Sequence, residues 1–461
     1  MACHPAHKGT AGPDTGETGD TGEPENADLC PLTTPTLEPA PLEPGVATIR
    51  WTTNASGSSV VLWREGDAEH GSVDDGAAAT EHAVLLAGLA PDAEVLWRVR
   101  TASGDFACES SEKPYTAPSV DIPPVNLDLF AHEEGASSGF RLLPVEGDTG
   151  RVIIVDDHGR IVWHWEADSA YAPADAFLDE DGTTVHVLAV SRDLETGEGG
   201  VYHVSLTGEA EFVPIPYVHH AMAPLSDGRI AVLEADPRPV GDELVAGDRV
   251  VARDADGQNP VQLFSTWDLW EPDMDVIHAQ TYNYYTTWLD WTHANSVNLR
   301  ADGGLLVSFH RISTVVSIDP GGNVDWTLVG SRSYIPSDFA IDGAEDDLFQ
   351  QQHNPIEVEG GILLFDNGPA VGQYSEAARY ELDEKDRTFR RVWTFDWDQA
   401  VDTDRQGDVQ PLDNGNTLVN WGGAGFLTEV TEDREVVWGL SAVNRFFGFS
   451  HQYDRIGGRV E

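Results

Sequence analysis

A repeated hairpin pattern over residues 119–461 limits the folds open to this chain more than any other feature. An entry strand follows a polar-Gly turn six times: DTGRVIIVD, EDGTTVHVLAV, SDGRIAVLE, ADGGLLVSF, EGGILLFDN and DNGNTLVNW. Glycine supplies the positive φ that tight hairpins need, and the alternation of Val, Ile, Leu and Trp is typical of strands. The pattern therefore predicts a repeating β structure with little room for helices.

A tryptophan-rich exit strand closes four of these units: HGRIVWHW, GGNVDWTLVG, FRRVWTFDW and REVVWGL. Six units over the 343 residues from 119 to 461 leave about 57 residues each, enough for a four-stranded blade. We therefore expect an all-β chain with a six-bladed β-propeller over 119–461. Because the repeats diverge, a sandwich or a β-solenoid stays open as an alternative. Segments of helical period are few, which argues against a helical bundle or a doubly wound α/β fold.

Two different segments precede the repeats. Residues 36–118 alternate as strands do, and the run LAGLAPDAEVLWRV resembles the Leu-x-Pro turn and following strand of a fibronectin type III domain. We expect a small fibronectin-III-like β-sandwich there, without chemistry of its own. Residues 1–35 are rich in Gly, Thr, Pro and acidic residues, which cannot bury a core, so this segment is predicted to be a disordered tether.

The charge of the chain excludes some partners. Asp and Glu number 79 against 27 Lys and Arg, giving a formal net charge of −52. Such a surface repels nucleic acid phosphates and anionic membrane surfaces, so an anionic ligand would need a local cationic pocket. No apolar run approaches the roughly 18 residues of a membrane-spanning helix.

The positions of the three cysteines suggest that the protein lies in an oxidising compartment outside the cytoplasm. Cys3 follows a small residue and precedes the tether, an arrangement that resembles the lipidation site of bacterial lipoproteins with its signal peptide missing. We expect Cys3 to carry a lipid anchor; an incidental cysteine is the alternative. Cys30 and Cys108 could then pair as a disulfide in an oxidising compartment, although three cysteines do not establish this pairing.

Histidines occur at matching points of three successive repeats, shortly before the turn and ahead of the first strand. They are His219 and His220 in YVHHAMAPLSDG, His293 in WTHANSVNLRADGG, and His353 in QQHNPIEVEGG. The innermost strands of a propeller line its central channel, so equivalent positions converge near its mouth. We therefore expect these histidines to share one site. A single histidine in such a place would be interpreted as structural.

Three histidines could also bind a metal, in the manner of an open catalytic zinc site. Asn295, two residues after His293, favours a different chemistry. Its neutral amide is better suited to holding an oxyanion than to ligating zinc. The sequence thus favours an anion site without a metal or another cofactor.

The ordered set of motifs is more specific than any one of them. H-x-N-S-V, then Q-H with F-D-N-G, then N-G-N-x-L-V-x-W-G resembles the bacterial arylsulfotransferase family over most of residues 120–461. This resemblance implies a six-bladed propeller, periplasmic or surface-exposed, often behind a small β domain. It also implies transfer of a sulfuryl group from a phenolic sulfate ester to a phenolic acceptor, without a nucleotide donor and through a transiently sulfated histidine.

The resemblance assigns roles to individual residues. The Gln-His pair before F-D-N-G implies that His353 is the nucleophile. The H-x-N motif implies that His293 and Asn295 hold the oxyanion, and the His-His pair implies the same for His219 or His220.

The chain departs from the family pattern in one strand. The family has an arginine in the pattern S-x-R-x-x-S/T, whereas VSFHRISTVV has His310 at the aligned position and Arg311 next to it. Adjacent strand residues point to opposite faces, so Arg311 could not replace the arginine without a bulge. Three explanations stay open: the alignment slips by one residue, His310 contacts the sulfate as an imidazolium, or the substrate differs. His451, in SHQYDR where relatives show an aromatic-Arg pair, is interpreted as structural.

Three hypotheses of different classes follow. The leading one is an extracytoplasmic arylsulfotransferase, tethered as a bacterial lipoprotein, that acts on a small phenolic sulfate donor and a phenolic acceptor by a ping-pong sulfo-histidine route. The first alternative is a non-catalytic surface propeller that binds a glycan or a protein. The second is a metal-dependent hydrolase that uses the same histidines.

Overall fold

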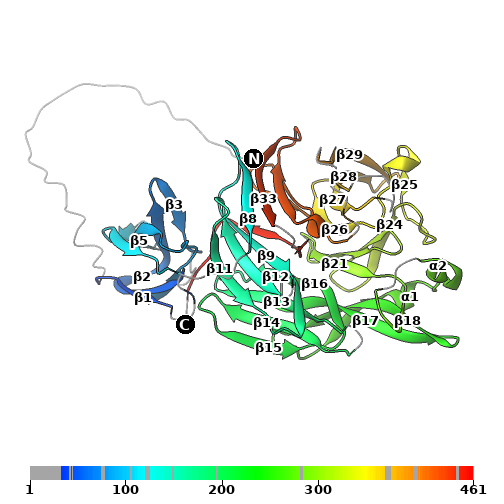
Figure 1. Ribbon diagram of the computed structural model, residues 1–461, viewed down its shortest axis with the longest axis horizontal. Helices are drawn as coiled ribbons and strands as arrows, with labels where there is room; N and C mark the ends of the chain where they lie inside the picture. The colour runs from blue at the N-terminus through cyan, green and yellow to red at the C-terminus, as the bar shows by residue number, and fades with distance from the viewer. Residues whose placement is uncertain are drawn as a thin grey trace, which may run out of the picture.

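The computed structural model consists almost entirely of β-strands (Figure 1). Residues 1–32, which include most of the expected tether, Cys3 and Cys30, lie outside the described residues. The described residues are 33–40, 43, 45–73, 78–103, 106–119, 125–147, 150–193, 196–280, 284–368, 375–397, 403, 405–442 and 446–459. Within these ranges two α-helices and two 3-10 helices occur: α1 (Thr266–Leu269), α2 (Met274–His278), η2 (Glu345–Asp347) and η3 (Gly422–Ala424).

Seven strands form a small β domain ahead of the propeller. They are β1 (Thr36–Pro39), β2 (Ala47–Glu65), β3 (Ala68–Gly71), β4 (Ala79–Leu86), β5 (Glu94–Ser103), β6 (Phe106–Glu109) and β7 (Lys113–Thr116). The long strand β2 pairs through its first part with β1 and β4, and through its second part with β3 and β5. Cys108 on β6 is disulfide-bonded. The likeness of this domain to fibronectin type III remains a prediction.

Six further sheets form the six blades of a propeller, which confirms the all-β prediction from the repeats. Blades 2 to 5 are built from consecutive segments of the chain. Blade 2 holds β12 (Tyr171–Leu178), β13 (Thr184–Ser191), β14 (Gly199–Ser205) and β15 (Ala210–Pro214); blade 3 holds β16 (Val218–Pro224), β17 (Ile230–Val240), β18 (Glu243–Arg253), β19 (Val261–Ser265) and β20 (Leu289–Asp290). Blade 4 holds β21 (Ala294–Leu299), β22 (Leu305–Phe309), β23 (Thr314–Ile318) and β24 (Val324–Val329); blade 5 holds β25 (Ala340–Ile341), β26 (His353–Val358), β27 (Gly361–Asp366), β28 (Glu376–Asp383) and β29 (Thr388–Phe395).

Both ends of the propeller segment close the ring. The N-terminal strand β8 (Leu127–His132) pairs with the outer strand of blade 6, and the C-terminal strands β34 (Phe446–Phe447) and β35 (His451–Tyr453) pair with β9 in blade 1. Blade 1 also holds β9 (Phe140–Glu146), β10 (Arg151–Asp156) and β11 (Ile161–Glu166); blade 6 holds β30 (Asp408–Pro411), β31 (Thr417–Asn420), β32 (Phe426–Val430) and β33 (Val436–Ala442). Each end thus covers a sheet edge that would otherwise be open.

The strand order corrects one expectation. In blades 2 to 6 the strand after the polar-Gly turn is the second strand of its blade, and in blade 1 it is the third, so none of them is an entry strand. The tryptophan-rich strands do stand fourth from the channel, as their interpretation as exit strands requires. The inner strands β12, β16, β21, β26 and β30 contact one another in order around the central channel.

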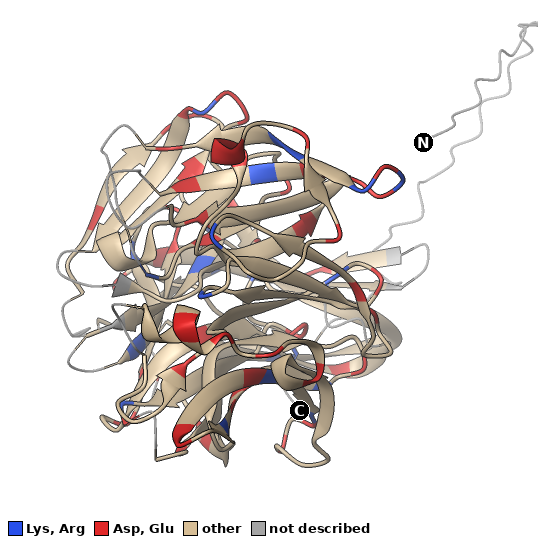
Figure 2. Cartoon of the chain, turned by 90° about the vertical axis from the view of Figure 1, so that its right-hand side faces the viewer, with Lys and Arg blue, Asp and Glu red and all other residues tan. Residues whose placement is uncertain are grey.

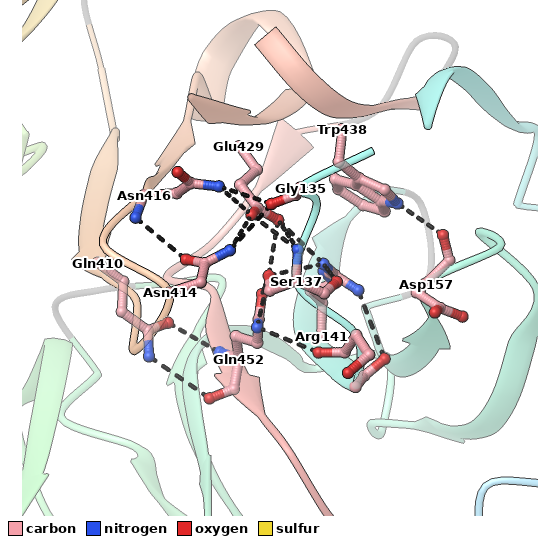
Figure 3. A network of polar contacts seen from close by, with 12 residues as sticks. Gly135, Ser137, Arg141, Asp157, Gln410, Asn414, Asn416, Glu429, Trp438 and Gln452 are labelled. Carbon is pink, nitrogen blue, oxygen red and sulfur yellow. Dashed lines mark hydrogen bonds and ion pairs between the residues drawn. The ribbon is translucent and has the colours of Figure 1, made fainter. Parts of the chain in front are cut away.

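A buried ion pair holds the closure between blades 1 and 6 (Figure 3). Arg141 on β9 and Glu429 on β32 are both fully buried, with Nη2 and Oε2 3.4 Å apart. The Arg141 guanidinium also lies over the Trp438 ring, 4.2 Å from its centroid. Glu429 accepts further hydrogen bonds from the Ser137 N–H at 2.8 Å and the Asn416 amide at 2.7 Å. A buried charge pair needs such additional partners to offset its desolvation.

The same network reaches the C-terminal strand (Figure 3). Gln452 on β35 donates from Nε2 to Ser137 Oγ at 2.8 Å, and its N–H donates to Gln410 Oε1 at 2.8 Å. Ser137 precedes β9, whereas Gln410 lies on β30 in blade 6. Strand β35 is therefore hydrogen-bonded both to the segment before β9 in blade 1 and to β30 in blade 6.

The small domain packs against blade 1. One apolar cluster includes Val84 and Leu89 of the small domain together with Leu142 and Val152 of the propeller. A bidentate ion pair joins Arg160 to Glu65 across this interface, at 2.9 and 2.7 Å.

Segments of the chain formed by acidic residues are spread over the visible loops and strands (Figure 2). Red segments are more frequent there than blue ones, in keeping with the net charge of −52. None of the helices in the described ranges has the length and apolar character needed to cross a membrane.

Candidate active site

Histidine rings from blades 3, 4 and 5 form a continuous row at the start of the inner strands. The Nδ1 atoms of His219 and His220 are 2.8 Å apart, and the His220 ring centroid lies 4.7 Å from that of His293. The row continues through His310, at 5.3 Å from His293, to His353, at 5.2 Å from His310. The structure therefore brings together all five histidines that the sequence singled out for this site.

Backbone irregularities aim two of these side chains. His220 and His293 have φ angles of 54° and 53°, in the left-handed region that side chains other than glycine rarely adopt. His220 lies where the pairing of β16 with β17 shifts register, and His293 stands directly before β21, whose pairing with β22 shifts between Ala294 and Ser296. Such bulges re-aim a side chain, and strain of about 1–3 kcal/mol per residue tends to persist where function requires it.

His353 is held in one tautomer by Asn367. The His353 Nδ1–H donates to Asn367 Oδ1 at 2.7 Å. Asn367 cannot be turned around, because its Nδ2 donates to the backbone carbonyls of Thr403 and Gln406 at 2.9 and 2.8 Å. The Nε2 atom of His353 consequently carries the lone pair. Asn367 was not singled out from the sequence, although it stands in the F-D-N-G motif.

His353 is also uncharged at neutral pH. Only 4% of its surface is exposed, and this burial lowers the pKa of His353 to about 3. A buried imidazole without a charge partner prefers its neutral form. The side chain thus offers a permanent nucleophilic nitrogen across the physiological pH range.

Asp290 connects His293 with Arg311. Its Oδ2 accepts a hydrogen bond from His293 Nδ1 at 2.7 Å and from Arg311 Nε at 3.1 Å. Although burial acts to raise it, His293 and Arg311 hold the pKa of Asp290 below its ordinary value. Asp290 is a site residue that the sequence did not reveal, because it stands in the same loop as His293 without belonging to a repeat position.

The location of His310 and Arg311 corrects the argument from strand alternation. Strand β22 ends at Phe309, and both residues lie in the turn that follows. Residues in a turn do not alternate between faces, so the His310 ring contacts His353 while Arg311 reaches Asp290. No bulge is needed for both to belong to the site.

The imidazolium explanation for His310 is not favoured. Burial, together with its histidine neighbours and Arg311, lowers the pKa of His310 well below its ordinary value. The neutral ring keeps an Nδ1 atom that is buried and has no hydrogen-bond partner in the described part of the chain.

Asn295 contacts the backbone directly before His353. It is fully buried, and its Nδ2 donates to the backbone carbonyl of Gln352 at 2.8 Å. Gln352 precedes His353 and is itself held by its amide, which donates to Ser308 Oγ at 2.9 Å. In this structure Asn295 positions the segment that carries His353; a direct contact with an oxyanion stays a prediction.

Asp248 fixes the loop that carries His293. Its Oδ2 accepts from Thr292 Oγ1 at 2.5 Å and from the Ala294 N–H at 2.7 Å, on either side of His293. Its Oδ1 lies 3.2 Å from Nε2 of His219, which is 3% exposed. His219 therefore faces the blade interior, whereas the ring of His220 faces His293. Asp248 is a second residue that the sequence did not identify.

One aromatic ring lies against the row. The Tyr284 ring centroid is 4.8 Å from that of His220 and 4.9 Å from that of His293. Trp291 and Trp421 are fully buried and belong to the core. Of these aromatics, Tyr284 is the one placed to contact an aromatic ligand.

The row does not converge on a point as metal ligands do. Among the described residues, the group of three or more ligand atoms within 4.8 Å of one another is Asp156, Asp157 and His158, in a turn of blade 1. Asp156 already accepts hydrogen bonds from the N–H groups of His158 and Arg160, at 3.0 and 2.8 Å.

The fold and the site define a β-propeller with a row of histidines along the inner strands of three blades. Residues 132–452, more than two thirds of the chain, match the arylsulfotransferase (ASST) family, and the chain belongs to that family. The resemblance drawn from the motifs is thereby confirmed.

Individual relatives are distant. The arylsulfate sulfotransferase AssT of Escherichia coli O6:H1 is 24% identical over 173 residues, which are 31% of this chain and 29% of that protein. The match thus spans less than a third of the length of this relative.

Solved structures are more distant still. A protein of unknown function from Bacteroides caccae is similar with a TM-score of 0.43 and 14% identity, over 68% of this chain and 98% of the other. A periplasmic gluconolactonase of Pseudomonas aeruginosa is similar with a TM-score of 0.37 and 12% identity, over 70% and 98%. At these scores we draw no conclusion from either likeness.

Proposed function

We propose that the protein transfers a sulfuryl group from a phenolic sulfate ester to a phenolic acceptor by a ping-pong mechanism through His353. One observation carries the proposal: Asn367 accepts from Nδ1, so the neutral Nε2 of a buried histidine is free to attack sulfur. Family membership supports the same chemistry.

Each half-reaction forms one bond to sulfur and breaks another. In the first, His353 Nε2 forms a bond to sulfur while the bond from sulfur to the aryl oxygen breaks, and the departing phenolate takes up a proton from solvent. In the second, an acceptor phenol oxygen bonds to sulfur, the N–S bond breaks, and the phenolic proton is released. Splitting one displacement into two in this way lowers each barrier.

Asn367 helps the first half-reaction. The imidazole ring of His353 becomes positively charged when Nε2 bonds to sulfur, and the Asn367 Oδ1, 2.7 Å from Nδ1, stabilises the remaining N–H. The amide also fixes the ring orientation, as the third member of a catalytic triad does.

The other histidines and Arg311 are suited to the sulfuryl oxygens. His220, His293 and His310 line the row that leads to His353, and Arg311 reaches the same place through Asp290. Donors already fixed in space stabilise charge that spreads over sulfuryl oxygens in the transition state. We assign the phenol ring to Tyr284, which lies against His220 and His293.

The test measures both half-reactions. Incubation with 4-nitrophenyl sulfate and phenol should release 4-nitrophenol and sulfate the phenol, and rapid-quench mass spectrometry should find the sulfuryl group on the peptide with His353. His353→Ala should abolish all three signals, whereas His158→Ala, at a histidine whose side chain is 57% exposed, should keep them.

Two other outcomes favour the alternatives. Normal turnover by His353→Ala would overturn the assignment, and stoichiometric metal in an active preparation would favour the hydrolase. Tight binding of a glycan or protein without sulfation of histidine would favour the non-catalytic propeller.

We also propose that the protein works outside the cytoplasm. Cys108 is disulfide-bonded, and disulfides persist mainly in oxidising compartments. The lipid anchor on Cys3 remains a prediction, which metabolic labelling with a fatty acid can test: Cys3→Ser should lose the label and release the protein from the membrane fraction.

A further inference from the structure

The histidine row occupies one half of the channel wall, in blades 3, 4 and 5. The inner strands of the other three blades also carry titratable side chains: Asp175 on β12, Asp408 at the start of β30 and His451 at the start of β35. The inner strands of a propeller repeat around its axis in the same direction, so their first residues gather at the same end of the channel.

Hydrogen bonds place this second group at the level of His353. Asn354, the next residue after His353, donates from Nδ2 to Asp408 Oδ1. The other oxygen of Asp408 accepts from the N–H and the Oγ of Ser450, at 2.8 and 3.0 Å. Ser450 is followed by His451, so a short chain of contacts leads from the nucleophile across blade 6 to blade 1.

Asp175 is the member of this group that can still accept a hydrogen bond. It is 3% exposed, and its Oδ2 accepts from the Met222 N–H at 2.9 Å in blade 3. Its Oδ1 is buried without a hydrogen-bond partner among the described residues, although His451 Nε2 lies 3.5 Å away. The His451 side chain keeps 34% of its surface exposed. The exposed surface of His451 therefore lies on one of the strands nearest the propeller axis.

The two halves of the channel shift the pKa of their histidines in opposite directions. Although burial acts to lower it, Asp175 and Asp408 raise the pKa of His451 above its ordinary value. Burial lowers the pKa of His353 to about 3 on the opposite side. Burial beside His353 thus favours a neutral imidazole, whereas Asp175 and Asp408 favour the protonated form of His451.

We propose that Asp175 and His451 form a second polar subsite, which binds a hydrogen-bond-donating substituent of the aromatic substrate, a second ring hydroxyl or an ammonium group. The inference rests on the proposed function, because the reacting phenol oxygen is taken to lie at His353. The substrate then bridges the channel, with its sulfated oxygen at the histidine row and its second polar group at Asp175.

The chemistry of the subsite selects this class. An ionised carboxylate only accepts hydrogen bonds, so Asp175 Oδ1 suits a hydroxyl or ammonium and repels a ring carboxylate. A methyl substituent at this place would leave the buried oxygen unpaired. Sites built to bind a hydroxyl in this way reject analogues that lack it far more strongly than apolar pockets discriminate by size.

The test compares three acceptors with 4-nitrophenyl sulfate as the donor: 1,4-dihydroxybenzene, 4-methylphenol and 4-hydroxybenzoate. Wild-type protein should show a kcat/KM at least roughly tenfold higher for 1,4-dihydroxybenzene than for 4-methylphenol, with 4-hydroxybenzoate slowest. In Asp175→Asn the amide can still accept from Met222 while presenting N–H to the subsite. In this variant the kcat/KM for 1,4-dihydroxybenzene should fall to within about threefold of that for 4-methylphenol, with little loss for 4-methylphenol itself.

Controls separate the subsite from the fold and from the proposed function. Asp67→Asn, in an exposed turn of the small domain, should keep the wild-type ratio. His451→Gln should also lower the ratio, which guards against misfolding of Asp175→Asn. Equal use of the first two acceptors by wild-type protein, or an unchanged ratio in both variants, overturns the subsite while leaving sulfuryl transfer in place.

Absence of turnover with every acceptor would instead count against the proposed function. The subsite is then tested by binding alone, with 1,4-dihydroxybenzene added to histidine-labelled protein. The NMR signals of His451 should shift on this addition in wild-type protein and not in Asp175→Asn. No shift in wild-type protein overturns the subsite.

Discussion

The side-chain carbonyl oxygen of Asn367 lies 2.7 Å from Nδ1 of His353 and thereby holds the ring proton on Nδ1, leaving the lone pair on Nε2. Replacing Asn367 by Leu removes this acceptor and lets the proton occupy Nε2. We expect kcat to fall on the order of 100-fold or more, as when the orienting member of a triad is lost, with KM changed far less. Steady-state kinetics measure the loss, and nitrogen NMR of labelled histidine should show the tautomer change. A variant with wild-type kcat would contradict this role.

Asp290 is expected to matter for the transition state. Asp290→Asn removes the charge that holds His293 and Arg311 together at 2.7 and 3.1 Å. We expect kcat to fall roughly 10- to 100-fold, because both groups are then less well aimed at the sulfuryl oxygens. Asp67→Asn serves as the control, and unfolding curves establish that the variant is folded. Unchanged kcat in folded Asp290→Asn would remove this pair from the mechanism.

Burial of His353 makes stability depend on pH. Its pKa is about 3 in the folded state and ordinary, about 6.5, in the unfolded state, so acid protonates the unfolded chain first. The contribution of the neutral His353 side chain to the free energy of unfolding is therefore fully present above pH 6.5. This contribution is lost as the pH falls towards 3. Between pH 7 and 5 this loss amounts to about 2 kcal/mol.

Urea unfolding of wild-type protein and His353→Asn at several pH values isolates this contribution. The difference in unfolding free energy between the two should shift by that amount in favour of the variant as the pH falls from 7 to 5. His158→Asn should follow the wild-type curve. Parallel curves for wild-type protein and His353→Asn would mean that His353 is not buried in its neutral form.

The buried ion pair of Figure 3 is expected to dominate the closure of the ring. Glu429→Gln leaves Arg141 charged and without its carboxylate in a fully buried place. We expect a loss of about 3–5 kcal/mol in the free energy of unfolding. Glu432→Gln is a matched control, because Glu432 pairs with Arg379 at the surface with 61% of its side chain exposed. That pair should contribute less than about 1 kcal/mol. Equal effects of the two substitutions would show that the closure does not depend on this pair.

The blades could be predicted because each is a local structure. The turns SDGRIAVLE and ADGGLLVSF and the tryptophan-rich strands carry the hairpins of blades 3 and 4 within short segments. Strands that pair with sequence neighbours leave a periodic signal that needs no knowledge of the rest of the chain. The order of strands was less visible, since the first strand of each blade has no glycine turn before it.

Equivalence between repeats located the histidines of the site, but not what surrounds them. Asp248 and Asp290 stand outside the repeated segments, and Asn367 ends the segment EGGILLFDN. The partners of all three are reached only after the blades have packed. The pattern VSFHRISTVV predicts a strand through His310 and Arg311, whereas β22 ends at Phe309. The alternation of strand side chains between two faces therefore does not apply to these two residues.

The β-propeller, the number of its blades, the family and the row of histidines could be predicted, because periodic hairpins and ordered motifs are properties of short segments. Only the packed blades show which nitrogen of His353 carries the lone pair, how His310 and Arg311 both reach the site, and which strands close the ring. It also brought His451, interpreted from the sequence as structural, to the channel beside Asp175, 276 residues earlier in the chain. The physical reason is that a hydrogen bond or an ion pair depends on distances of a few ångströms between residues, and closure of the ring sets those distances.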